Sequence, residues 1–184
     1  MLSNSDKAVK IREGQSLKTD SLETFIRNAM ELPEAHMEVL QFPSGYSNLT
    51  YLLKFGKKEL VLRKPPQGVK IKSGHDMGRE FRILSGLHPI YNKVPQPFLF
   101  SDELSIIGSP FYIMERMNGV IFRGHTPKDQ LPDLNQMRKL SEAFVSTLVE
   151  IHSFNYHAAG LENLGRPDGY VKRQIEGWTK RYIK

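Results

Sequence analysis

Three consecutive segments of alternating apolar and polar residues restrict the fold more than any other feature of this sequence. They cover Glu38–Phe42, Leu49–Phe55 and Glu59–Lys64. Alternation with a period of two is typical of strands that bury one face. The connections between the segments are short and rich in turn-forming residues, which favours antiparallel neighbours. The Pro65-Pro66 pair ends the third segment, because proline has no amide donor for a sheet. We therefore predict a three-stranded antiparallel meander.

Helical periodicity and two further strand patterns account for most of the remaining chain. The predicted helices are Asp20–Met30, Ser73–Leu87, Gln136–Phe154 and Gly169–Ile183, and the additional strands are Phe98–Ser101 and Phe111–Glu115. Asp20 or Ser21 is the expected N-cap of the first helix, and Ser73 or Asp76 lies near the start of the second. The predicted order is therefore one helix, three strands, one helix, two strands and then helices.

The composition excludes several classes of function. The chain has 184 residues and no cysteine, which excludes disulfides, cysteine-zinc sites, iron–sulfur clusters and thiol nucleophiles. The net charge of +6 favours anionic ligands such as nucleotides. Nucleic acid would also suit this charge, but the interleaved aromatic and basic residues of a nucleic-acid surface are missing. A polar N-terminus and the lack of an apolar run of about 20 residues lead us to expect a cytoplasmic protein without a membrane partner.

Five sequence blocks, taken together, are specific enough to indicate a family. They are Ser44–Leu53, Leu60–Pro66, Arg79–Leu84, Ile107–Glu115 and Gly169–Gln174. In these blocks the chain resembles the aminoglycoside phosphotransferase and choline-kinase-like superfamily. The similarity is greatest to the branch found fused to some acyl-CoA dehydrogenases, and it extends from Asp20 onward.

The resemblance implies an α+β fold of the protein-kinase type. We expect an N-lobe built from a five-stranded antiparallel sheet and one αC-type helix, followed by the first helices of an α-helical C-lobe. The expected divisions are a flexible N-terminus over residues 1–19, the N-lobe with its leading helix over residues 20–117, and the hinge and start of the C-lobe over residues 118–184.

The turn between the first two strands is the first candidate nucleotide site. In a kinase fold this loop lies over the nucleotide phosphates, where backbone N–H groups of small residues can approach an anion. The resemblance assigns that role to Ser44, Gly45, Ser47 and Asn48. A plain hairpin turn is the alternative, since the chain contains neither a G-x-G-x-x-G nor a Walker motif.

The third strand carries the second candidate site. A kinase places a cation there, paired with a helix carboxylate, to hold the α- and β-phosphates. The resemblance aligns Arg63 with this cation and Glu80 with its partner. Adjacent strand residues point to opposite faces, so only one of Arg63 and Lys64 can face the cleft, and we choose Arg63 because it shares a face with Val61. The alternatives are two solvated strand cations and a Glu80 paired with a nearby helix arginine.

The last strand of the predicted N-lobe runs into a hinge. In the family, adenine bonds to hinge backbone, and the positions concerned here are Met114, Glu115 and Met117. The alternative for the two methionines is core filling, which suits their flexible side chains.

The chemistry of the family requires residues that this sequence does not contain. The catalytic segment H-G-D-x-x-x-x-N and the later metal-binding aspartate are both absent from the 184 residues. We therefore assign no catalytic and no metal-binding residue, and we expect no phosphotransferase activity from this polypeptide alone. Three interpretations stay open: part of a longer enzyme, which we favour; a half that a second chain complements; or a non-catalytic nucleotide-binding or protein-interaction module.

The cofactors and partners follow from the family. We expect ATP or GTP with Mg²⁺ as cofactor and, in the full-length protein, a small molecule with a hydroxyl group as phosphoryl acceptor. The apolar stripe of the helix Gln136–Phe154 would lie exposed without further C-lobe residues, which predicts self-association.

Overall fold

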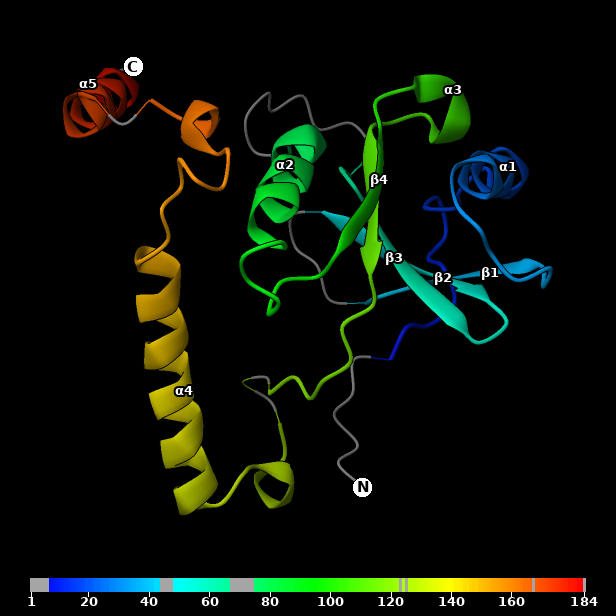
Figure 1. The fold of residues 1–184 in the computed structure, drawn as a ribbon, viewed down its shortest axis with the longest axis horizontal. Coiled ribbons are helices and arrows are strands. Elements are labelled where there is room, and N and C mark those ends of the chain that lie inside the picture. The colour runs from blue at the N-terminus through cyan, green and yellow to red at the C-terminus, as the bar shows by residue number, and fades with distance from the viewer. Residues whose placement is uncertain are drawn as a thin grey trace.

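The computed structural model describes residues 7–43, 48–66, 75–122, 124, 126–166 and 168–183. A five-stranded antiparallel sheet with the strand order β1-β2-β3-β5-β4 forms its centre (Figure 1). The strands are β1 (Met37–Gln41), β2 (Leu49–Phe55), β3 (Lys58–Lys64), β4 (Pro97–Ser101) and β5 (Phe111–Glu115). This sheet, with the helix that follows its third strand, confirms the predicted α+β fold class.

Helices cover both faces of the sheet. α1 (Thr19–Ala29) and the short α3 (Leu104–Ile107) lie on one face, where Leu22 and Ile26 join the main core. α2 (Met77–Leu87) lies on the opposite face, and its Phe81 ring contacts Phe100 and Tyr112 at centroid distances of 5.8 and 6.4 Å. Figure 1 shows the three layers, with α1 and α2 on opposite sides of the strands. The strands therefore bury apolar side chains on both faces.

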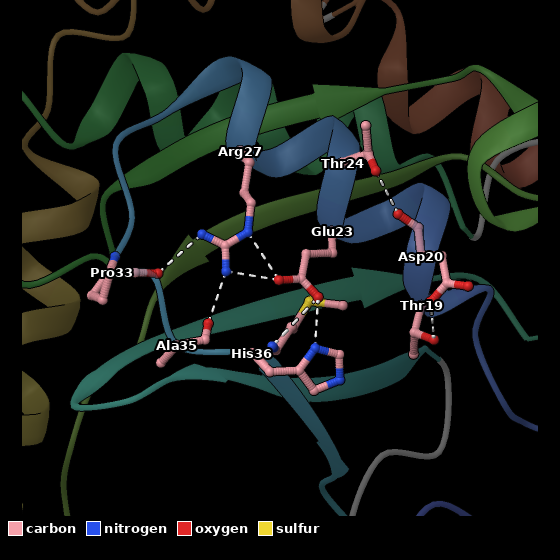
Figure 2. A network of polar contacts seen from close by, with 9 residues as sticks. Thr19, Asp20, Glu23, Thr24, Arg27, Pro33, Ala35 and His36 are labelled. Atoms are coloured by element: carbon pink, nitrogen blue, oxygen red, sulfur yellow. Dashed lines mark hydrogen bonds and ion pairs between the residues drawn. The ribbon is translucent and has the colours of Figure 1, made fainter.

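A polar network fixes α1 and the connection to β1 (Figure 2). Arg27 donates from Nε and Nη2 to Glu23 Oε1 at 2.9 and 2.7 Å, and its remaining contacts reach the carbonyl oxygens of Pro33 and Ala35 at 3.0 and 2.8 Å. Glu23 Oε2 in turn accepts from the backbone N–H of Met37 at 3.4 Å. One arginine thus satisfies the carbonyl groups of a connection that has no regular hydrogen bonding of its own.

The segment before α1 runs along β1. Val9 and Gln41 form an isolated antiparallel bridge. The Gln41 side chain is 1% exposed; its Oε1 accepts from the Arg12 N–H at 3.0 Å, and its Nε2 donates to Gln15 Oε1 at 2.5 Å. Buried polar groups of this kind require such partners. The flexibility expected for residues 1–19 stays a prediction, and residues 9–15 make these ordered contacts.

The two long helices beyond the sheet differ from it in their surroundings. They are α4 (Leu134–His152) and α5 (Tyr170–Ile183), and Figure 1 shows both standing apart from the strands. Neither helix contains a buried residue among those described. Asp133 and Gln136 close a full capping box at the start of α4. Within the described ranges no helix is long and apolar enough to cross a membrane.

Most predicted elements agree with the structure to within two residues, and four details were wrong or missed. α1 begins after Lys18, which makes no side-chain cap, so neither Asp20 nor Ser21 is its N-cap. α2 begins at Met77, where the Asp76 side chain accepts from the Arg79 N–H, rather than at Ser73. α3 was not predicted, because four residues are too few to show helical periodicity. Two 3-10 turns, Lys128–Gln130 and Glu162–Leu164, were also missed.

Candidate functional site

Strand alternation places Arg63 on the face of the sheet that α2 covers. Its neighbours Leu62 and Lys64 point to the opposite face, and in the pairing of β3 with β5 it lies directly opposite Tyr112. Arg63 reaches a cavity of about 300 Å³, a volume at the lower end of the range for small-molecule sites. The residues that line this cavity are Phe42, Thr50, Val61, Arg63, Pro95, Met114, Glu115, Arg116 and Met117. We call this space the Arg63 cavity.

Arg63 and Glu80 form an ion pair between β3 and α2. The Arg63 Nε donates to Glu80 Oε2 at 3.1 Å, and both side chains are 31% exposed. No other hydrogen bond links the Arg63 side chain to the described residues. Its terminal nitrogens Nη1 and Nη2 therefore keep donors that an anion in the cavity could accept. The alternative partners for Glu80 are not used, since Arg79 and Arg82 make no ion pair with it within the described part of the chain.

Glu80 accepts two further hydrogen bonds. Asn48 Nδ2 donates to Oε1 at 2.9 Å, and the Tyr112 hydroxyl donates to Oε2 at 2.9 Å. Asn48 Oδ1 also lies 2.7 Å from His75 Nδ1. The carboxylate is thus held from three sides, by Asn48 just before β2 and by residues of β3 and β5. Burial raises the pKa of the Tyr112 hydroxyl, and the neighbouring Glu80 carboxylate raises it further, so Tyr112 stays a hydrogen-bond donor at neutral pH.

The segment after β5 forms another wall of the Arg63 cavity. Met114 packs with Phe42, Leu52 and Val61 in a small cluster on this face of the sheet. The Glu115 N–H donates to the Gln96 carbonyl oxygen at 2.8 Å, which ties this segment to the residue before β4. Met117 follows with 48% of its surface exposed.

Phe42 and Arg116 close one side of the cavity. The Arg116 guanidinium carbon lies 4.6 Å from the centroid of the Phe42 ring, at the end of β1. Stacking of this kind is favourable by about 0.5–1 kcal/mol where the pair is exposed. The Phe42 ring and the Arg116 guanidinium therefore line the cavity where the residue after β1 meets the segment after β5.

The structure brings together six of the residues that the sequence analysis named. Arg63, Met114, Glu115 and Met117 line the cavity, and Glu80 pairs with Arg63. Asn48 contacts Glu80 and His75 through its side chain. Ser44, Gly45 and Ser47 lie outside the described residues. The sequence analysis missed Tyr112 and His75, whose pairing with the site depends on the sheet order and on the placement of α2.

Lys64 points to the opposite face of the sheet from Arg63. It is 4% exposed, it lies two positions after Leu62 on the same face of β3, and burial lowers the pKa of its amino group. Removing a charged amine from water is costly, so Lys64 is poorly placed to act as a freely accessible anion ligand. The parity argument that selected Arg63 therefore agrees with the burial of its neighbour.

A larger hollow lies elsewhere on the molecule. It has a volume of about 680 Å³ and lies between the loop after α2 and the end of α4, where Lys93 and Glu150 form an ion pair at 2.6 Å. The Tyr91 and Phe154 rings also meet there, with centroids 4.9 Å apart. We place the candidate function in the smaller Arg63 cavity, because there a paired arginine presents donors that no described residue accepts.

The comparisons with known proteins agree with this fold. The model of the phosphotransferase enzyme family matches residues 38–184. The chain belongs to this family. It is 35% identical to the mouse acyl-CoA dehydrogenase family member 10 over 94% of its own length and 16% of that protein. It is 38% identical to the human acyl-CoA dehydrogenase family member 11 over 81% of its own length and 19% of that protein. The chain therefore spans less than a fifth of either relative.

A solved structure supports the same assignment. The crystal structure of a Ralstonia eutropha protein, provisionally described as an aminoglycoside phosphotransferase, matches with a TM-score of 0.72 and 28% identity. The match covers 91% of this chain and 48% of the other. The superfamily and the branch predicted from the five sequence blocks are both confirmed.

The described residues suit the anionic part of a nucleotide better than a metal ion. Phosphotransferases of this kind use ATP and Mg²⁺, and Arg63 offers the charge and the forked donors that phosphate requires. No group of three His, Asp or Glu side chains close enough to hold a metal occurs in the described ranges. The fit therefore concerns the nucleotide, and we assign no metal ligand.

Proposed function

We propose that the Arg63 cavity binds a nucleoside triphosphate for phosphoryl transfer to a hydroxyl group of a small molecule. The observation that supports this most strongly is the Arg63–Glu80 ion pair, in which, among the described residues, the guanidinium bonds through Nε alone. Arg63 would hold the phosphates, and the apolar side chains of Val61 and Met114 would contact the base. ATP or GTP is the expected nucleotide.

Each described residue has a limited role in this proposal. Arg63 neutralises phosphate charge and orients the nucleotide, and Glu80 orients Arg63. Backbone groups of the segment after β5 would bond the edge of the base. Mg²⁺, when bound with the nucleotide, would neutralise the phosphate charge further. Because the sequence contains no H-G-D-x-x-x-x-N segment, we expect nucleotide binding without phosphoryl transfer from these 184 residues alone.

Titration calorimetry with ATP, in the presence and absence of Mg²⁺, tests the proposal. We expect measurable binding by the wild-type chain and a loss of about ten- to hundredfold for Arg63→Ala, because charge-assisted hydrogen bonds contribute about 1.5–3 kcal/mol. Arg79→Ala is the matched control, since it removes an equal charge from the exposed side of α2. Equal affinity of both variants, or a folded wild-type chain that binds no ATP, would contradict the proposal.

A non-catalytic interaction module is a second candidate, and one observation favours it. The apolar residues of α4 and α5 are exposed over the whole of both helices, including Phe144 at 72% and Trp178 at 64%. Contiguous apolar surface of this kind marks interaction sites. A protein that self-associates through these helices and binds no nucleotide would favour this candidate over the first.

A further inference from the structure

Glu80 and a nucleotide phosphate would compete for the N–H donors of Arg63. A guanidinium and a carboxylate pair most favourably through two parallel hydrogen bonds, which use both carboxylate oxygens and two guanidinium nitrogens. The observed pair uses one nitrogen, Nε, and one oxygen, Oε2, at 3.1 Å. A two-bond pairing would take up a terminal nitrogen of Arg63 that a nucleotide phosphate needs. Some other contact must therefore favour the weaker arrangement.

Two neighbours fix the rotation of the Glu80 carboxylate. The Tyr112 hydroxyl donates to Oε2 at 2.9 Å, and Asn48 Nδ2 donates to Oε1 at 2.9 Å. A carboxylate oxygen can accept two hydrogen bonds, so neither contact by itself fills its oxygen. Together they hold Oε2 towards the Arg63 Nε, and rotation of the carboxylate towards a two-bond pairing would disturb both bonds.

Tyr112 is also rigidly placed. It is 3% exposed, it lies opposite Arg63 in the register of β3 and β5, and its ring contacts Phe81 of α2. A buried ring with a single polar tip holds that tip in one position. The hydroxyl is therefore a fixed donor between the strand that carries Arg63 and the helix that carries Glu80.

We propose that Tyr112 is a positioning residue: its hydroxyl fixes the rotation of the Glu80 carboxylate so that Oε2 alone pairs with Arg63, and so keeps the terminal nitrogens of Arg63 available to a nucleotide phosphate. This inference rests on the proposed function of the Arg63 cavity. Tyr112 itself touches no nucleotide in this scheme. Loss of the hydroxyl acts on the phosphates alone, because the base contacts lie on Val61 and Met114.

The test compares the affinities for ADP and for adenosine. Tyr112→Phe keeps the ring and its packing and removes the hydroxyl alone. Tyr51→Phe is the matched control, because Tyr51 is also fully buried and its hydroxyl also makes one hydrogen bond, to the Gln15 carbonyl oxygen at 2.8 Å on the other face of the sheet. We expect Tyr112→Phe to weaken ADP binding about three- to tenfold and to leave adenosine binding within about twofold, while Tyr51→Phe changes neither.

The possible outcomes separate the positioning role of Tyr112 from the proposed function of the Arg63 cavity. Unchanged ADP affinity in Tyr112→Phe, or an equal loss for ADP and adenosine, overturns the positioning role and leaves the proposed function standing. A wild-type chain that binds ADP no better than adenosine overturns the proposed function and the inference together.

A second measurement needs no variant and no nucleotide. In nitrogen-15 spectra of the wild-type protein, we expect a protected Arg63 Nε–H and terminal nitrogens that rotate freely and give one averaged signal. Two distinct, slowly exchanging terminal-nitrogen signals would mean that Glu80 already forms two bonds to Arg63, which overturns the proposal even if Tyr112→Phe fails to fold.

Discussion

In the sheet, Leu53, Leu60 and Ile113 have no exposed surface, whereas in α4 Leu148 is 45% exposed and Phe144 is 72% exposed. Both regions have apolar residues at the periodicity of their secondary structure. They differ in what surrounds them, since helices cover both faces of the sheet and nothing described covers the apolar stripes of α4 and α5. Periodicity in the sequence therefore predicts a helix or strand, whereas the contribution of that helix or strand to folding stability depends on whether its apolar face is covered.

The same substitution in the two regions gives the largest expected contrast. Leu53→Ala removes a fully buried side chain and should lower the free energy of unfolding by about 2–5 kcal/mol. Leu148→Ala, on the exposed stripe of α4, should change it by less than about 0.5 kcal/mol. Urea denaturation of both variants measures the difference. Equal losses would mean that the apolar stripe of α4 is also covered in solution, which would contradict the contrast between the two regions.

Gly86 of α2 lies against residues 159–161, so a substitution at this position can disrupt the contact between α2 and the segment after α4. A Cβ at position 86 would lie 2.5 Å from the Ala159 carbonyl oxygen and 2.6 Å from Leu161 Cδ2. Gly86→Ala should therefore separate α2 from residues 159–161, at a cost of about 1–3 kcal/mol. Gly177→Ala in α5 is the control, because nothing lies within 4 Å of its Cβ, and helix propensity should make it neutral or stabilising by up to about 1 kcal/mol.

Hydrogen exchange is the measurement for this pair of variants. We expect Gly86→Ala to speed exchange in residues 156–164 while the strands stay protected. Exchange that speeds equally in β2 and β3 would mean that the sheet depends on this contact, which would contradict the independence of the two regions.

The exposed stripe of α4 should also control the association state. Phe144→Ser removes the most exposed aromatic side chain of that helix and should lower the average mass in sedimentation at high protein concentration. Lys139→Ser changes an exposed residue of the same helix without removing apolar surface and should have no such effect. A wild-type protein that is a monomer at all concentrations would contradict this prediction.

The smallest expected effect concerns pH and the network under α1. Burial acts to raise the pKa of Glu23, but the hydrogen bonds from Arg27 and the Met37 N–H outweigh it and hold the pKa below its ordinary value of 4.5. The unfolded chain therefore binds the proton more readily, so this stabilisation is present above about pH 4.5 and is lost as the pH falls through the lowered value. Melting temperatures of the wild type and Glu23→Gln should converge below that pH, and parallel curves would contradict the assignment.

The elements that the sequence predicted well are those whose signal is local. β2 and β5 were predicted with their observed bounds, because alternation and turn residues mark both ends. The family resemblance aligned Arg63 with the strand cation, and strand parity separated it from Lys64. The start of α1 was wrong because Lys18 precedes it without any capping hydrogen bond, so no side chain marks the boundary.

The parts of the site that could not be predicted depend on distant segments. Tyr112 meets Glu80 only because β5 lies beside β3 and α2 crosses that face, and neither arrangement is written in a local pattern. The pairing of Glu80 with Arg63 was expected from the family resemblance, since the periodicity of α2 alone favoured a nearby arginine. His75 contacts Asn48 for the same reason, across 27 positions of sequence.

Hydrogen exchange with and without ADP tests the central claim most directly, because it compares the two regions in one experiment. We expect ADP to slow amide hydrogen exchange in residues 48–64, in α2 and in residues 111–117, and to leave the exchange rates of α4 and α5 unchanged. Protection confined to α4 or α5, with β3 and the segment after β5 unaffected, would contradict the assignment of the nucleotide to the Arg63 cavity.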